Sequence, residues 1–304
     1  MDQRHDVRRS QARTRLPLNL TAKQSTNYSK AIYQLQRSDL NMTYFLSDAH
    51  LGSRAIDNPQ AHQQTLIAML QHMAKDATAI YLLGDIFDFW CEYFWRDSSK
   101  EQYRPFLQTL RALTDKGIDI HFFIGNHDIW TFGWLEQQTG VHVHRKPRSI
   151  MIGSKKLYLA HGDGLVPNNY IAQLPKKIQK KIRQFIFLRK VFHSPILQFF
   201  FRLLPPSWGN AFGYEWAKKS RLKELANPFP YKGEHKEELV LFAKEQEQRG
   251  NHHDYYIFGH RHIELDLMLS RDSRIMILGD CWQQFTYAQM DELGNTTLNN
   301  FEQF

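Results

Sequence analysis

Short apolar runs alternate with amphipathic stretches along residues 43–128. Runs of consecutive apolar residues predict strands at 43–48, 79–85 and 119–128. Between them, residues 63–77 and 103–117 carry apolar side chains at helical spacing, and the second stretch ends on a glycine. This βαβαβ order predicts a layered α/β domain.

The C-terminal half shows hairpin-like strand patterns instead. They cover residues 143–163, 255–262 together with 274–280, and 285–301. A mostly helical segment, about 165–235, lies between them, and we expect it to be an insertion in one domain that spans 42–304. Residues 1–41 are polar, Arg-rich and weakly periodic, which predicts a disordered basic N-terminal extension.

Composition narrows the class of protein and where it works. With only two cysteines, Cys91 and Cys281, no disulfide framework is expected, and a reducing cytoplasm is favoured. No apolar run approaches the roughly 20 residues of a membrane span, and the N-terminus lacks the apolar core of a secretory signal.

The net charge of +8 is unevenly distributed along the chain. Residues 1–41 carry +5 and residues 176–206 carry +8, so the remaining residues carry −5. Two basic segments on a mildly acidic body indicate local contacts with anionic partners rather than general stickiness.

Polar residues cluster directly after five strand-like runs. They read DAH (48–50), GDIFD (84–88), GNHD (125–128), HGD (161–163) and GHRH (259–262). Loops at strand ends are where an α/β scaffold presents reactive groups. One such motif is common by chance, but five in this order predict a site. Asp, His and Asn without cysteine suit divalent Mn, Fe, Zn or Co.

The order of these motifs resembles that of the calcineurin-like metallophosphoesterases, whose signature is DxH, GDxxD, GNH[DE], H and GHxH. The resemblance spans about 42–285, and every motif is intact. It implies a four-layer α/β/β/α fold, a β-sandwich flanked by helices, with the loops meeting at two divalent metal ions. A non-catalytic binding module is disfavoured, because no metal ligand is missing.

The resemblance also assigns roles to individual residues. One ion would be held by Asp48, His50 and His262, and the other by Asn126, His161 and His260. Asp85 would bridge the two ions, which need a shared anion. His127 would act as an acid or phosphate-binding group, and Asp88 would orient it. Manganese is the usual activator of this family.

Longer stretches around the motifs resemble the bacterial UDP-2,3-diacylglucosamine pyrophosphatases of the lipid A pathway. The stretches are FLSDAHLG, YLLGDIFDFWCEYFW, FFIGNHDIWTFGWL, LAHGDGL and YYIFGHRH. This narrower resemblance implies hydrolysis of a UDP-linked, diacylated sugar lipid in the cytoplasm of a Gram-negative bacterium. A generic phosphodiesterase, a phosphatase and a nuclease stay open, because the fold serves all of these activities.

Residues 176–206 combine eight Lys or Arg with no acidic residue, and six Phe with four Ile and four Leu. An amphipathic helix is predicted over 176–193, followed by a nearly all-apolar helix that begins at Ser194 and Pro195 and ends at Pro205 and Pro206. A hairpin buried against the domain would account for the apolar stripe but not for the unpaired cations.

We therefore predict that this segment is a lid that touches an anionic membrane surface and receives lipid chains. The enzyme would then associate peripherally with the inner membrane. Nucleic-acid arms interleave cations with stacking aromatics, so contiguous Ile, Leu and Phe disfavour nucleic acid. No obligate protein partner is evident. The candidate lid residues are Phe185, Phe187, Phe199, Phe200 and Phe201.

Four polar residues complete the candidate site. Lys218, Lys219 and Arg221, near the end of the insertion, are candidates to reach the diphosphate, with a solvated helix face as the alternative. Arg221 comes first among them because a guanidinium binds phosphate in a bidentate way. Asn168 is a further candidate.

The aromatic block FDFWCEYFW, residues 87–95, is unusual in a loop. Core packing is expected for most of it. Its rings could also line a nucleotide or acyl groove, and both alternatives stay open.

Overall fold

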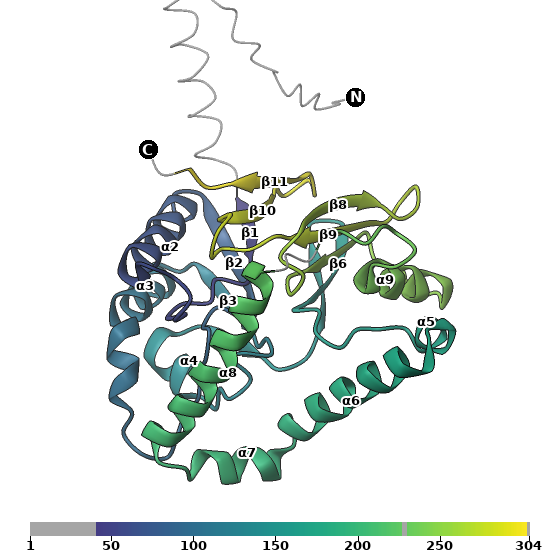
Figure 1. The fold of residues 1–304 in the computed structure, drawn as a ribbon. Coiled ribbons are helices and arrows are strands. Elements are labelled where there is room, and N and C mark those ends of the chain that lie inside the picture. Colours follow the sequence, from purple (N-terminus) through teal and green to yellow (C-terminus); the bar gives the residue numbers. More distant parts are fainter. Residues whose placement is uncertain (1–40, 227–229, 303–304) are drawn as a thin grey trace, which may run out of the picture. The chain divides into compact units, whose positions relative to one another are not determined.

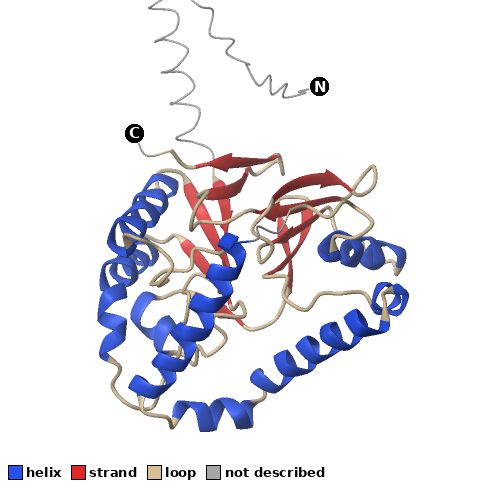
Figure 2. Cartoon of the chain, in the orientation of Figure 1, coloured by secondary structure: helices blue, strands red, loops and turns tan. Residues whose placement is uncertain are grey.

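Two β-sheets face each other, with helices on their outer sides, in the computed structural model (Figures 1 and 2), which describes residues 41–226 and 230–302. The first sheet has the order β11-β10-β1-β2-β3-β4 and the second β5-β6-β7-β9-β8. The predicted N-terminal extension lies outside the described residues, apart from Asn41.

The strands of the first sheet are β1 (Met42–Leu46), β2 (Ala77–Leu83), β3 (Asp119–Phe123), β4 (His142–His144), β10 (Thr286–Met290) and β11 (Thr296–Asn300). Those of the second are β5 (Arg148–Ile152), β6 (Lys155–Ala160), β7 (Tyr255–Phe258), β8 (Glu264–Met268) and β9 (Arg274–Leu278). The body helices are α2 (Pro59–Met73), the 3-10 helix η1 (Ser98–Tyr103), α3 (Arg104–Asp115), α4 (Trp134–Thr139) and α9 (Glu238–Gln248). The insertion contributes α5 (Asn168–Gln173), α6 (Lys176–Phe192), α7 (Pro195–Arg202) and α8 (Pro206–Ala226).

Alternation along the strands builds three apolar layers. Phe45 of β1 packs between the sheets with Ile257 of β7, whereas Tyr44 packs on the outer side among residues of α2 and α3. On the far side of the second sheet, Tyr256 and Phe258 pack with α9. The predicted four-layer α/β/β/α architecture is therefore confirmed.

The element boundaries differ from the sequence prediction at α2. This helix begins at Pro59 rather than at residue 63, because the side chain of Asn58 accepts a hydrogen bond from the N–H of Ala61 and a proline occupies the first turn. It ends at Met73, since β2 starts at Ala77. Edge strand β8 was not predicted, and its residues alternate between exposed and half-buried.

Parallel pairing brings the motif loops to one edge of each sheet. Strands β1, β2 and β3 are parallel neighbours in the first sheet, and β6 and β7 are parallel neighbours in the second. The carboxyl ends of these five strands therefore point the same way within their sheets. The five polar motifs follow these ends.

The insertion is not a hairpin buried against the domain. Helix α6 has no buried residue, and Phe185 and Phe187 are 45% and 63% exposed. On α7, Phe199 and Phe200 are 51% and 61% exposed. No helix in residues 41–226 or 230–302 combines the length and apolar character needed to cross a bilayer.

Phe201 differs from the other four candidate lid residues. Its ring stacks on Trp130 with 4.3 Å between centroids, and the side chain packs against the main core. Phe201 therefore attaches the insertion to the body and does not present a free apolar surface.

The aromatic block after β2 divides into core and surface. Phe87 and Trp90 are buried and stack with 4.3 Å between ring centroids, whereas Phe94 and Trp95 are exposed. Within the block lies Glu92, a buried carboxylate. It accepts the main-chain N–H groups of Trp134 and Leu135, both at 2.9 Å, and also that of Phe132. Glu92 thus satisfies the free amides at the start of α4.

Replacing Glu92 by leucine should lower the free energy of unfolding by about 2–4 kcal/mol, because three buried or part-buried main-chain amides lose their acceptor. Glu92→Gln keeps one accepting oxygen and should cost less. Urea denaturation followed by circular dichroism measures both changes. Glu101→Leu is the matched control on the exposed face of η1, and its effect should stay within about 0.5 kcal/mol. Equal stability of the two leucine variants would contradict this role of Glu92.

Candidate dinuclear metal centre

Five loops from both sheets bring the predicted ligands together. Asp48 and His50 follow β1, Asp85 follows β2, Asn126 follows β3, His161 follows β6, and His260 and His262 follow β7. Six of these residues form two groups whose ligand atoms lie within 4.8 Å of one another: Asp48 with His50 and His262, and Asp85 with His161 and His260.

The backbone of these loops is left-handed at five of the ligands. Asp48, His50, Asp85, His260 and His262 have φ between 46° and 69°. Positive φ is uncommon at residues other than glycine, and each such residue raises the energy of the backbone by on the order of 1 kcal/mol. Their concentration in three of the loops, those after β1, β2 and β7, indicates that the loop shape serves the placement of the side chains.

The first group surrounds the carboxylate of Asp48. His262 Nε2 lies 3.1 Å from Asp48 Oδ1, and His50 Nε2 lies 3.3 Å from His262 Nε2. Asp48 Oδ2 accepts the main-chain N–H of His260 at 2.8 Å. Asp48 Oδ1 is buried and accepts no hydrogen bond from the described residues, although His262 is close to it. This oxygen keeps its lone pairs, and a cation fits beside it.

The second group surrounds His161. Its Nδ1–H donates to the carbonyl of Leu83 at 2.8 Å, which directs Nε2 toward Asp85 Oδ2 and Asn126 Oδ1, each 3.3 Å away. Burial opposes protonation, but the charge of Asp85 raises the pKa of His161 well above its ordinary value. A bound cation would have to displace this proton.

Asp85 lies between the two groups. Its charge acts on Asp48 and His50 of the first group as well as on His161. The main-chain N–H of His127 donates to Asp85 Oδ1 at 2.8 Å. A side chain at Gly125 would overlap that same oxygen, so the glycine leaves room for the carboxylate. This position is compatible with the bridging role that the sequence predicted.

Asp88 contacts two histidines in different ways. His127 Nδ1–H donates to the main-chain carbonyl of Asp88 at 2.6 Å. The carboxylate of Asp88 instead lies 3.3 Å from His50 Nδ1, behind the first group. Burial raises the pKa of Asp88 to about 7. The sequence prediction named Asp88 as the residue that orients His127, and the structure provides that contact through the backbone.

Arg221 is the predicted substrate-binding residue that reaches the centre. It is buried, and Nη1 lies 2.7 Å from Glu224 Oε2 and 3.4 Å from His262 Nδ1. Its Nε is buried without a hydrogen-bond partner among the described residues. Lys219 and Asn168 are exposed and Lys218 is half-buried, and no contact within the described chain connects these three with the ligands.

Sequence reasoning missed two residues that α8 contributes. Glu224 Oε1 lies 2.6 Å from His262 Nδ1, so this carboxylate holds both His262 and Arg221. The ring of Trp216 lies 4.8 Å from that of His127. Residues three apart share a helix face, so the spacing of Glu224 from Arg221 was the available signal.

Removing Asp85 should abolish metal binding while the protein remains folded. Glu224→Gln should weaken metal affinity about 10–100-fold, because a carboxylate behind a ligating histidine orients the ring. Metal content after dialysis, measured by mass spectrometry, and titration with Mn²⁺ report both effects. His127→Ala serves as the control and should keep its metal. Full metal content in Asp85→Ala would contradict the shared carboxylate.

Comparisons with known proteins identify the family of this chain. A family model described as calcineurin-like phosphoesterase matches residues 43–264. A UDP-2,3-diacylglucosamine hydrolase from Porphyromonas gingivalis is 35% identical over 258 residues, which cover 82% of this chain and 93% of that protein. One from Neisseria meningitidis serogroup A is 27% identical over 185 residues, or 61% of this chain and 69% of that protein.

Among solved structures, the phosphoesterase Yfce from E. coli matches with a TM-score of 0.38 and 13% identity, covering 82% of this chain and 88% of that one. The assignment rests on the sequence matches, of which the family model covers most of the chain. This chain belongs to the calcineurin-like phosphoesterase family.

Proposed function

We propose that this protein hydrolyses the pyrophosphate of UDP-2,3-diacylglucosamine to UMP and 2,3-diacylglucosamine 1-phosphate, a step in lipid A synthesis. The observation that carries the proposal is a pair of Asp and His groups that could hold metal ions, next to an exposed apolar and basic insertion. A relative that is 35% identical over 82% of the chain carries the name of this activity. A generic phosphodiesterase, phosphatase or nuclease would need the site but not the insertion.

Two divalent ions, with manganese as the expected metal, would supply an activated water and neutralise the phosphate charge. The seven predicted ligands would hold them, with Asp85 shared between the two groups. These donor atoms fit a metal such as manganese, because buried carboxylate oxygens and imidazole nitrogens suit borderline divalent metals.

The side chains around the ligands have their own tasks in this proposal. Arg221 would bind an oxygen of the diphosphate, and Glu224 keeps the guanidinium beside His262. Because His127 Nδ1–H is committed to the carbonyl of Asp88, Nε2 is the atom that would exchange a proton with, or bind, the leaving phosphate. Trp216 covers His127 from α8 and would limit the access of water.

The insertion would place the enzyme at a membrane surface. Exposed Phe185 and Phe187 on α6, and Phe199 and Phe200 on α7, offer an apolar surface beside the lysines and arginines of α6. We propose peripheral association with the cytoplasmic face of the inner membrane of a Gram-negative bacterium. Contiguous aliphatic and phenyl groups with neighbouring cations suit anionic lipids better than nucleic acid.

Arg221→Ala should lower kcat/KM for UDP-2,3-diacylglucosamine about 10²-fold, because a buried cation beside the phosphate is lost. Arg221→Lys should recover part of the activity. Lys223→Ala, an exposed position on the same helix, is the matched control and should stay near wild type. Release of UMP with and without Mn²⁺ is the measurement.

The same preparations should be tested on bis-p-nitrophenyl phosphate. Turnover of this simple diester without turnover of the UDP-lipid would leave only a generic phosphoesterase and reject the proposed substrate.

A double variant, Phe199→Ser with Phe200→Ser, should lose flotation with anionic vesicles by at least about a hundredfold, because two apolar side chains no longer enter the lipid. Met268→Ser with Leu293→Ser removes two exposed apolar side chains outside the insertion and is the control. Salt-dependent binding to oligonucleotides without vesicle binding would favour the nuclease instead.

A further inference from the structure

A hollow of about 750 Å³ lies between the insertion and the body. Arg145 and Lys146 reach it from the loop between β4 and β5, Arg189 and His193 from the end of α6, and Arg202 from the end of α7. Neither a metal ligand nor a carboxylate belongs to its lining within the described chain. Four permanent cations from three segments therefore face one solvent-filled space.

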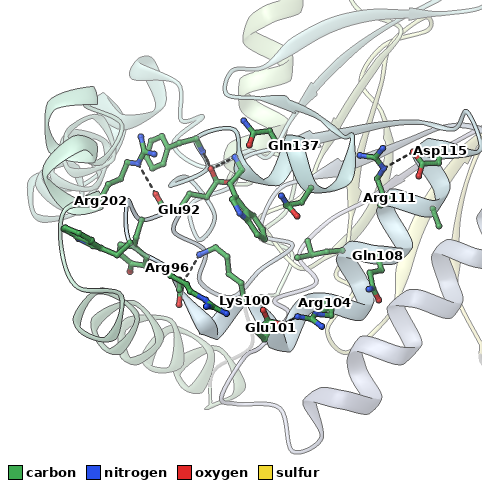
Figure 3. A pocket seen from close by; sticks show the side chains of 18 residues that line it. Glu92, Arg96, Lys100, Glu101, Arg104, Gln108, Arg111, Asp115, Gln137 and Arg202 are labelled. Atoms are coloured by element: carbon green, nitrogen blue, oxygen red, sulfur yellow. Dashed lines mark hydrogen bonds and ion pairs between the residues drawn. The ribbon is translucent and has the colours of Figure 1, made fainter.

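A neighbouring pocket of about 780 Å³ shows how unusual this charge distribution is (Figure 3). Five basic residues line it against four carboxylates, and three of the five are paired: Lys100 with Asp97, Arg104 with Glu101 and Arg111 with Asp115. That pocket is nearly neutral and requires no anion. Arg202 lies between the two spaces and lines both.

Most of the cations of the hollow lack such partners. Arg189 pairs with Asp163, but Arg145, Lys146 and Arg202 form no ion pair with any described carboxylate. Glu92 and Glu136, whose charges act on Arg145, already accept main-chain amides. The lining therefore carries a positive charge that an anion would neutralise.

Part of this lining is held rigidly. Arg202 Nε donates to the carbonyl of Glu92 at 3.0 Å, and the guanidinium carbon lies 4.1 and 4.3 Å from the ring centres of Phe94 and Phe132. His193 Nε2 is buried without a hydrogen-bond partner among the described residues. Pro195 of the first turn of α7 also faces the hollow, and a helix N-terminus favours an anion. These groups are pre-organised for several oxygens, as a phosphate offers.

The rim of the hollow is apolar and belongs to the surface expected to meet lipid. Phe199 lines the hollow and is 51% exposed. Ile196 and Phe200 of the same helix are 71% and 61% exposed. In a bilayer the phosphates lie directly above the acyl chains, so a helix that places Phe199 among acyl chains would bring the adjacent cations to phosphate level.

We propose that this hollow binds the phosphate of an anionic membrane phospholipid while the exposed side chains of α7 enter the acyl layer. This site is distinct from the metal centre, and its ligand is a bilayer component rather than the substrate. The inference deepens the membrane contact proposed above and rests on it.

The test compares two pairs of charge-removing substitutions in the full-length protein. Arg145→Ala with Lys146→Ala changes the hollow. Lys75→Ala with Lys116→Ala removes the same charge from exposed positions elsewhere on the body. These two lysines precede β2 and β3, whereas the metal-site loops follow these strands. Binding is measured by co-sedimentation with vesicles of phosphatidylcholine alone and of phosphatidylcholine mixed with phosphatidylglycerol.

The hollow variant should bind the mixed vesicles about thirtyfold more weakly, because each basic residue at an anionic surface contributes about fivefold. The control pair should bind them nearly as wild type does, and binding of both pairs to phosphatidylcholine alone should be unchanged. Monomeric dihexanoyl-phosphatidylglycerol should bind the wild type saturably in calorimetry, and the hollow variant should lose this binding. Thermal unfolding verifies that both variants are folded.

Three results would overturn the inference. Equal losses of vesicle binding in the two double variants would show that only the net charge of the protein matters. Displacement of dihexanoyl-phosphatidylglycerol by inorganic phosphate at equal concentration would make the hollow a site for free phosphate. Failure of the wild type to bind any vesicle would remove the membrane contact itself, whereas UMP release from substrate in detergent micelles would still test the proposed reaction separately.

Discussion

The structure depends on the burial of three carboxylates among five histidines at the ends of strands from both sheets. Asp48, Asp85 and Asp88 are all nearly inaccessible to solvent. Buried like charges are costly unless cations or hydrogen bonds compensate them. Main-chain amides of His127 and His260 compensate part of the charge. His262 lies 3.1 Å from Asp48 Oδ1, and a divalent cation would compensate the remainder.

The same constraint explains the architecture around the centre. Parallel neighbours β1, β2 and β3 bring three of the loops together, and β6 and β7 bring the other two. The left-handed backbone at five ligands raises the energy of these loops locally. The apolar layers on both sides of the sheets provide the stability that permits it.

The insertion combines a helix that is held in place with one that is not. Helix α8 packs closely on the body, because Gly213 has no side chain to collide with the ring of Phe89 and Tyr214 hydrogen-bonds to Tyr103 at 3.1 Å. It can therefore position Arg221 and Glu224 at the metal centre. Helix α6 has no buried residue and contacts the body mainly near its C-terminal end, through Arg189 and Phe192. Its free surfaces suit a mobile or fluid partner such as lipid.

The sequence by itself indicated the alternation of strands and helices before the site motifs, the seven candidate ligands and the unusual composition of the insertion. These are local properties: strand periodicity, short motifs and charge can be read from neighbouring residues. It also identified Arg221, whose chemistry suits phosphate.

Only the tertiary structure decided which neighbours these residues have. The carboxylate of Asp88 lies 3.3 Å from His50, while His127 donates to the main-chain carbonyl of Asp88. Glu224 supports His262, and Phe201 packs on Trp130 while Phe200 stays exposed. Each contact joins residues more than 35 positions apart. Such pairs depend on how the layers and helices pack in space, which local patterns do not encode.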